Sequence, residues 1–305
     1  MNKCRFDLWF HLRLAAGIAA LIFCALLTLA RPASAGETPC FAGPRDVAAR
    51  NQAALHTLPV APFGRQEAGW AIYAPLIGNE IGVGCSVDTP GFARVLAAWQ
   101  GKHGLVASGA VDAQTLLLLK GLWQAKRPFI LNSRHGGCPA APAERALARA
   151  AASESYGGKT ILLQPQALAA YRQMAAAARG EGLIPSNSSL FTIFSGFRSP
   201  AYDGARCARQ HNCQGLVRAS CSAHRTGFAM DVNLGAAPGF TPDSSADTNR
   251  LYLAQTPLYR WLVANAARFG FANYAFEPWH WEYVGVSSLR AAAGLSLAQR
   301  VAVSR

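Results

Sequence analysis

Near the C-terminus, residues 277–284 read EPWHWEYV, which places a carboxylate, an imidazole and several aromatic rings within eight positions. An imidazole can bind a metal ion, and a carboxylate beside that ion can act as a general base. Residues three apart in a regular strand point to opposite faces, so Glu277 and His280 could meet only if Pro278 interrupts the strand. Trp279 would then be a candidate substrate-binding residue. A buried aromatic strand without any metal has a similar composition, so other segments must decide.

A second segment, residues 222–233 with the sequence SAHRTGFAMDVN, supplies the complementary groups. In an extended strand the alternation of side chains turns the apolar residues of this segment to one face and Asp231 to the other. His224 lies seven positions before Asp231. Together with His280, these residues provide two imidazoles and a carboxylate, the three-ligand set with which proteins hold catalytic zinc while leaving a fourth position for water. The sequence therefore predicts a zinc (Zn2+) site at His224, Asp231 and His280, with Glu277 as general base.

Two further residues are candidates for substrate binding. Arg198, in the segment SGFRS, has the planar guanidinium that pairs well with a carboxylate, although a surface arginine in a turn would look the same. Ser222 lies two positions before His224. A serine hydrolase built on Ser222, His224 and Asp231 is disfavoured, because the three crowd one short segment without a nucleophile elbow.

These candidate residues fall on a mixture of helices and strands. Residues 190–199, 227–234 and 277–284 have the β-branched and aromatic composition of strands, whereas residues 164–183 and 256–271 have helical periodicity. The two types do not alternate as regular βαβ units. This order predicts an α+β domain.

The first half of the chain contains a predicted pair of helices. Thr89 with Pro90 gives a start signal for the first helix, and Asp112 is placed to cap the second. Residues 136–159 are rich in Gly, Ala, Pro and Ser and predict a linker or connecting helix, with weak helical character at 143–152.

Residues 1–35 resemble a cleavable export signal. Basic residues precede an apolar run at 14–30, and the small residues ASA follow at 33–35. The alternative is a transmembrane anchor, but the run of 17 residues is at the short limit for spanning a bilayer. We therefore expect an exported protein, periplasmic or associated with the cell wall, without a stable membrane span after cleavage.

Six cysteines remain after residue 35, and an even number in an oxidising compartment indicates disulfides. Six cysteines allow 15 connectivities. Three lie before residue 140 and three after residue 200, so complete pairing requires an odd number of bridges between the two halves. A structural zinc cluster is the less favoured alternative, since its residues lack paired C-x-x-C spacing: Cys207, His211, Cys213 and Cys221.

The chain is strongly basic. Its formal net charge is +13, and removal of residues 1–35 takes away four basic residues and one acidic residue, which leaves +10. In an exported protein this charge favours anionic cell-wall polymers or membrane surfaces as partners and not nucleic acid.

The blocks SGFRS, SAHRTGFAMDVN and EPWHWEY together resemble the VanY-type zinc D-alanyl-D-alanine carboxypeptidases, members of the lysostaphin and hedgehog-like metallopeptidase clan. The resemblance covers about residues 163–284. It implies a small, mainly antiparallel sheet with flanking helices, zinc bound by His224, Asp231 and His280, Glu277 as the catalytic base, and Arg198 as a catalytic residue that stabilises the substrate or its transition state. Many members have a glutamine shortly after the Arg-Ser pair, where this chain has a long insertion with three cysteines.

Residues 90–124 separately resemble a small helical peptidoglycan-binding domain, although an ordinary helical hairpin would have a similar pattern. The expected organisation is therefore a signal peptide at 1–35, an N-terminal region at 36–135 with a small helical domain at about 86–125, a linker at 136–159 and a zinc peptidase domain at 160–305.

The expected activity is removal of the terminal D-alanine from peptidoglycan stem peptides. Two alternatives within the same chemistry are an L,D-carboxypeptidase and a stem-peptide endopeptidase. A noncatalytic cell-wall-binding protein is the alternative from another class, and Glu277 argues against it because binding alone requires no base beside the metal.

Overall fold

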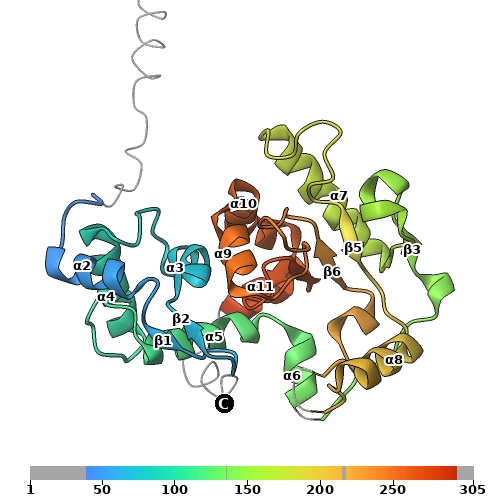
Figure 1. The fold of residues 1–305 in the computed structure, drawn as a ribbon, viewed down its shortest axis with the longest axis horizontal. Coiled ribbons are helices and arrows are strands. Elements are labelled where there is room, and N and C mark those ends of the chain that lie inside the picture. Colours follow the sequence, from blue (N-terminus) through green and yellow to red (C-terminus); the bar gives the residue numbers. More distant parts are fainter. Residues whose placement is uncertain (1–38, 135, 215–217, 294–305) are drawn as a thin grey trace, which may run out of the picture. The chain divides into compact units, whose positions relative to one another are not determined.

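The computed structural model describes residues 39–134, 136–214 and 218–293, with side chains to residue 289 (Figure 1). The expected export signal at residues 1–35 lies outside these ranges. Within them, no helix combines the length and the apolar character that crossing a membrane would require.

The N-terminal half of the described chain is mainly helical. The helical pair predicted from the sequence is present: the hydroxyl of Thr89 accepts a hydrogen bond from the Phe92 amide at the first helix, and the carboxylate of Asp112 accepts one from Thr115 at the second. The regular elements of this half are α2 (Arg45–Ala54), β1 (Pro59–Val60), β2 (Glu67–Ala68), α3 (Ala74–Ile81), α4 (Pro90–Lys102), α5 (Ala113–Ala125) and α6 (Pro128–Arg134).

The C-terminal half contains a sheet of four antiparallel strands with accompanying helices, which agrees with the α+β prediction and with the mainly antiparallel sheet that the resemblance implies. Its strands are β5 (Ile193–Ser195), β6 (Ala229–Val232), β7 (Phe271–Asn273) and β8 (His280–Tyr283), in the order β5-β6-β8-β7. The accompanying helices are α7 (Pro165–Gly180), α8 (Pro200–Gln210), α9 (Asp247–Gln255), α10 (Pro257–Asn265) and α11 (Val286–Ala293).

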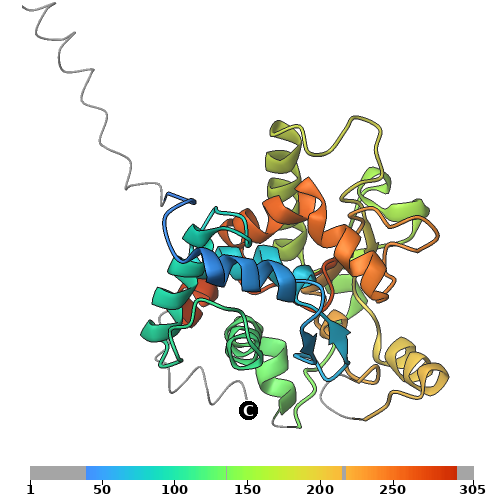
Figure 2. The same ribbon diagram turned by 60° about the vertical axis from the view of Figure 1, so that its left-hand side comes forward.

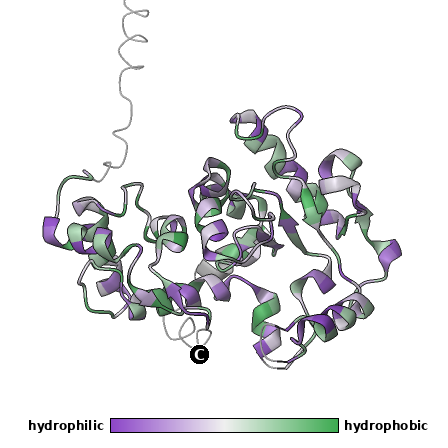
Figure 3. Ribbon diagram, viewed as in Figure 1, coloured by the Kyte–Doolittle hydropathy of each residue, from purple (hydrophilic) through white to green (hydrophobic). Residues whose placement is uncertain are grey.

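The two halves pack against each other in the region of α9 and α10. Helix α10 contacts α3, and α9 contacts the 3-10 turn at Ala71–Tyr73 (Figures 1 and 2). Buried side chains of both halves, among them Trp70, Phe92, Tyr259 and Trp281, form one continuous hydrophobic cluster. Most helices accordingly combine hydrophilic with hydrophobic residues along their length (Figure 3).

Two local expectations differ from the structure, and one segment without an expectation forms a helix. Residues 143–152 form a 3-10 turn at Glu144–Ala146 and the strand β3 (Ala148–Arg149), which pairs with β4 (Leu162–Leu163), instead of a helix. The strand expected at 190–199 is confined to Ile193–Ser195, because Phe191 adopts a positive φ of 65° just before it. The insertion after Ser199 contains the helix α8, which the Ser199 hydroxyl caps.

Three disulfides account for all six cysteines: Cys40–Cys85, Cys138–Cys221 and Cys207–Cys213. Only Cys138–Cys221 joins the two halves, which confirms the expected odd number. The alternative zinc cluster is wrong, because its three cysteines are engaged in disulfides.

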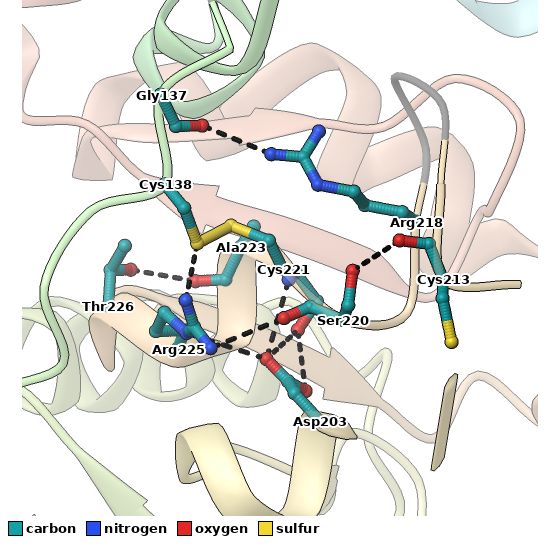
Figure 4. The surroundings of a disulfide bond; sticks show 11 residues. Gly137, Cys138, Asp203, Cys213, Arg218, Ser220, Cys221, Ala223, Arg225 and Thr226 are labelled. Atoms are coloured by element: carbon teal, nitrogen blue, oxygen red, sulfur yellow. Dashed lines mark hydrogen bonds and ion pairs between the residues drawn. A yellow bond between two sulfur atoms is a disulfide. The ribbon is translucent and has the colours of Figure 1, made fainter. Parts of the chain in front are cut away.

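The Cys138–Cys221 bridge lies beside a network of polar contacts (Figure 4). Arg225 contacts the Cys138 sulfur and donates to the Ser220 carbonyl, while its Nε lies 3.8 Å from the Asp203 carboxylate. Asp203 is fully buried on α8. The bridge and the network therefore fix the segment that leads into His224.

Candidate functional site

The site centres on a direct pairing between two strands. Asp231 on β6 faces His280 on β8 in the antiparallel register, so the two side chains project from the same face of the sheet. Asp231 Oδ1 lies 2.9 Å from His280 Nδ1, and Asp231 Oδ2 lies 3.2 Å from His224 Nε2. The candidate donor atoms of all three residues lie within 4.8 Å of one another, and all three side chains are buried.

His224 reaches this cluster from the 3-10 turn Ala223–Thr226. Gly227 ends the turn with a φ of +73°, a backbone conformation that favours glycine. The Nδ1 atom of His224 lies 2.7 Å from the Gly196 carbonyl. Since a carbonyl only accepts, Nδ1 carries the hydrogen and leaves the lone pair of Nε2 facing the cluster.

His280 has a corresponding outer partner that the sequence analysis missed. Its Nε2 lies 3.1 Å from Glu282 Oε1, which leaves Nδ1 facing Asp231 and His224. Glu282 is buried and forms an ion pair with Arg127, with 3.0 Å between Arg127 Nε and Glu282 Oε1. The spacing of two between His280 and Glu282 was a usable signal, because residues i and i+2 share one strand face.

Glu277 joins the site through a turn. Its amide donates to the Tyr274 carbonyl at 2.8 Å, and its own carbonyl accepts from the His280 amide at 2.9 Å, so β8 begins only at His280. Glu277 Oε2 then lies 3.9 Å from His280 Nδ1. The interruption expected at Pro278 is thus present, and the two side chains converge.

Arg198 is placed beside the cluster. Its Nη2 donates to Asp231 Oδ2 at 3.0 Å and to Ser195 Oγ at 2.8 Å, and its amide donates to the His224 carbonyl at 3.3 Å. The guanidinium is thereby held at the site and is not a free surface group.

Ser222 and Trp279 line the same cavity as the cluster. The hydroxyl of Ser222 donates to the Asp203 carboxylate at 3.2 Å. Trp279 is almost completely buried, with 3% of its surface exposed, so it forms part of the wall.

The buried charges shift the pKa values of the site residues. Burial would lower the pKa of His280, but hydrogen bonds and charges of Asp231 and Glu282 raise it to about 9. Burial and the charge of Arg198 lower the pKa of His224 to about 4. Burial would raise the pKa of Asp231, yet its contacts with the two histidines hold it well below the usual range. Burial raises the pKa of Glu277. The two imidazoles are therefore electrostatically distinct.

The donor set fits zinc. It comprises two imidazole nitrogens and one carboxylate oxygen, and the second nitrogen of each histidine has a carbonyl or carboxylate partner that fixes its orientation. Such a hydrogen bond on the second ring nitrogen is typical of histidines that bind a metal.

The cluster opens into a cavity of about 610 Å³, a size suited to a small ligand or peptide. Basic groups outnumber acidic groups in its lining, which favours an anionic ligand. The basic residues are Arg127, Lys159, Arg198, Arg206, Arg209 and Arg218, and the acidic residues are Asp231, Asp243 and Glu277.

Residues 160–286 match the VanY family model, described as D-alanyl-D-alanine carboxypeptidase. A search of curated proteins found no match.

Several solved structures are similar to the chain, and three of them follow. The LdcB LD-carboxypeptidase is 23% identical with a TM-score of 0.34, covering 47% of this chain and 70% of that chain. A mutant of the vancomycin resistance D,D-pentapeptidase VanY in complex with Zn(II) is 20% identical with a TM-score of 0.31, covering 53% and 93%. DacB from Streptococcus pneumoniae is 21% identical with a TM-score of 0.30, covering 54% and 96%.

Proposed function

We propose that the VanY-family domain at residues 160–286 is a zinc-dependent D-alanyl-D-alanine carboxypeptidase that removes the terminal D-alanine from peptidoglycan stem peptides. The observation that carries this proposal is the convergence of His224, Asp231 and His280 in one cavity with Glu277. A carboxylate beside a zinc-type donor set can supply the general base and the metal that zinc-dependent peptide hydrolysis uses.

In this proposal His224 Nε2, Asp231 and His280 Nδ1 hold the zinc ion. When bound, zinc supplies a Lewis acid that polarises the scissile carbonyl and lowers the pKa of water. The outer hydrogen bonds to Gly196 and Glu282 keep both imidazoles oriented for this task.

Glu277 is the proposed general base. It lines the cavity next to His280, and the raised pKa that burial gives its carboxyl brings it closer to the pH at which a base must both accept and return a proton. Its carboxylate takes a proton from the attacking water and passes that proton to the leaving amine of D-alanine.

Arg198, Ser222 and Trp279 are the proposed substrate-binding residues. The guanidinium of Arg198 can pair with the terminal carboxylate or with the charge that develops on the carbonyl oxygen. Its fixed position at Asp231 and Ser195 supports this role, because a pre-oriented donor loses little entropy when it binds. Ser222 and Trp279 line the adjoining wall of the cavity.

The proposed location is outside the cytoplasm, in the periplasm or at the cell wall. Three disulfides and the leader-like sequence at 1–35 support it. The proposed partners are stem peptides and the anionic cell wall, and not nucleic acid. We also propose that the helical segment at about 86–125 contributes to wall binding, because it resembles a peptidoglycan-binding domain.

The deciding experiment is incubation of the zinc-loaded protein, with its disulfides intact, with a pentapeptide stem, followed by mass spectrometry. We expect loss of one terminal alanine that Glu277→Gln or a chelator abolishes. Cleavage of a tetrapeptide stem in place of the pentapeptide would indicate an L,D-carboxypeptidase. Cleavage of a cross-linked stem would indicate an endopeptidase. Wall binding without any cleavage would establish a noncatalytic protein.

A further inference from the structure

Arg127 lies outside the matched VanY domain, yet its side chain reaches the edge of the candidate zinc site. It occupies the junction between α5 and α6 in the helical half, and it is one of the residues lining the cavity. Only 4% of its side chain is exposed. An arginine at a helix junction is ordinarily a solvated residue, so this burial requires a structural reason.

The reason is an ion pair with Glu282. Arg127 Nε donates to Glu282 Oε1 at 3.0 Å, and Arg127 Nη2 donates to the same oxygen. Both side chains are equally buried. Glu282 lies on β8, the strand that pairs with β6 on one side and with β7 on the other. A carboxylate buried this deeply is strongly destabilising unless a cation accompanies it.

The same oxygen of Glu282 also faces the site. It lies 3.1 Å from His280 Nε2, so the connection runs from Arg127 through Glu282 to His280, whose Nδ1 faces Asp231. Such a carboxylate–histidine pair fixes the ring orientation and raises the basicity of a metal-binding histidine.

Arg127 is itself held in place from two sides. Its Nη1 donates to the Gln124 side chain at 2.6 Å, and its guanidinium lies over the Tyr274 ring, 4.2 Å from the centroid. The Tyr274 ring in turn contacts His280 edge to face. The guanidinium thus has a single defined orientation toward the sheet.

The helical half that carries Arg127 is fixed against α9 of the C-terminal half by a second buried ion pair. Arg250 on α9 lies 3.1 Å from Glu67, and Arg250 Nη2 donates to Tyr73 at 2.8 Å. Arg250 and Glu67 are almost completely buried. The position of Arg127 relative to Glu282 is therefore set by packing and not by a flexible tether.

We propose that Arg127 is a positioning residue for the zinc site, which orients the Glu282 carboxylate so that it accepts from His280 Nε2 and directs His280 Nδ1 toward the metal. This inference rests on the zinc site proposed above. It means that the helical half, predicted as a wall-binding region joined by a linker, completes the site of the peptidase domain.

The test is zinc affinity, measured on the full mature chain by competition with a chromophoric chelator. We expect Arg127→Met to bind zinc about tenfold or more weakly, within the range known for outer partners of metal-binding histidines. Arg127→Lys keeps the charge but loses the planar fork, and we expect it to recover part of the affinity. The matched control is Lys126→Met, because Lys126 pairs with Glu80 inside the helical half, and its zinc affinity should equal that of the unaltered protein.

A double-variant cycle separates positioning from general destabilisation. If Arg127 acts through Glu282, Arg127→Met should weaken zinc binding little further in a Glu282→Gln background. The hydrogen-bonded Nε2 proton of His280, observed by NMR in the zinc-loaded protein, should shift in Arg127→Met and not in Lys126→Met.

Three results would overturn the inference: unchanged zinc affinity in Arg127→Met, an equal loss with and without Glu282→Gln, or an unshifted Nε2 proton. If Arg127→Met fails to fold, the zinc affinities of Arg127→Lys and Glu282→Gln still test the proposal. Wild-type zinc affinity in both variants would reject the positioning role of Arg127. Absence of zinc binding by the unaltered protein would instead reject the proposed function, and the positioning role with it.

Discussion

Asp231 and His280 face each other across β6 and β8, with 2.9 Å between Asp231 Oδ1 and His280 Nδ1. This register places the carboxylate and the imidazole on one sheet face, while Met230 and Trp281, the neighbouring pair, are buried in the core on the other. A shift by one residue would reverse both faces, so core packing and the site specify the same register.

Glu277→Gln should abolish most of the proposed hydrolysis while leaving the proposed zinc site intact. Glutamine keeps the size of the side chain but cannot accept the proton, and general-base catalysis contributes about 10²–10⁴-fold in rate. Steady-state kcat on a pentapeptide stem, together with zinc content by elemental analysis, checks this. A variant with substantially unchanged kcat would exclude Glu277 as the base.

Asp231→Ala should remove zinc-dependent stabilisation. A ligand that binds only the folded state stabilises it by about 2.7 kcal/mol at a concentration 100 times its Kd. We expect added zinc to raise the melting temperature of the unaltered protein and of Glu277→Gln, but not of Asp231→Ala. Equal zinc-induced shifts in all three proteins would show that the metal binds elsewhere.

Zinc affinity should depend on pH through His280. Asp231 and Glu282 outweigh burial and raise the pKa of His280 to about 9, so below that pH the metal-free imidazole holds a proton that zinc must displace. The apparent affinity should therefore fall about tenfold for each pH unit below 9. His224, with its pKa lowered to about 4, adds no proton near neutral pH.

Calorimetry at neutral pH in buffers of different ionisation enthalpy should accordingly detect release of about one proton per zinc from His280. The metal-free protein should show the matching stability change. A pKa raised above the unfolded value of about 6.5 stabilises the fold below that value, and this contribution is lost as pH rises through about 9. Affinity that stays constant between about pH 7 and 9 would contradict the assignment.

Removal of Cys138–Cys221 should destabilise the protein more than removal of Cys207–Cys213. The first bridge closes 83 residues and the second closes 6, and the chain-entropy relation gives about 2 kcal/mol more for the longer loop. Paired Cys→Ser variants of each bridge, compared by urea unfolding, provide the measurement and its matched control. The opposite order of stability would show that local contacts and not loop closure dominate.

Arg250→Met should destabilise the fold strongly without involving the zinc site. It leaves Glu67 buried without a cation, which costs about 3–5 kcal/mol. Adding Glu67→Gln should restore part of the loss, because the uncompensated charge is then gone.

We expect one cooperative unfolding transition, since both halves share one core. Two separate transitions would instead indicate independent domains.

Local signals in the sequence were sufficient for much of the site. Alternation around Asp231, the interruption at Pro278 and the caps at Thr89 and Asp112 depend on neighbours within a few positions, and the structure forms each of them. The segment 143–152 was misassigned because its alanines favour a helix, whereas pairing of β3 with β4 overrides that propensity. Glu282 shares a strand face with His280, but nothing in the sequence near it indicates its ion pair with Arg127.

The sequence by itself supplied the candidate residues of the proposed site: two imidazoles, a carboxylate and a candidate base, on a predicted strand and beside a predicted interruption at Pro278. The tertiary structure decided which cysteines pair, that Ser222 binds Asp203, and that Arg127 reaches Glu282 across 155 positions of sequence. Periodicity and capping act over one or two turns of chain. Contacts between distant segments arise only when the whole core packs, and they carry no local pattern in the sequence.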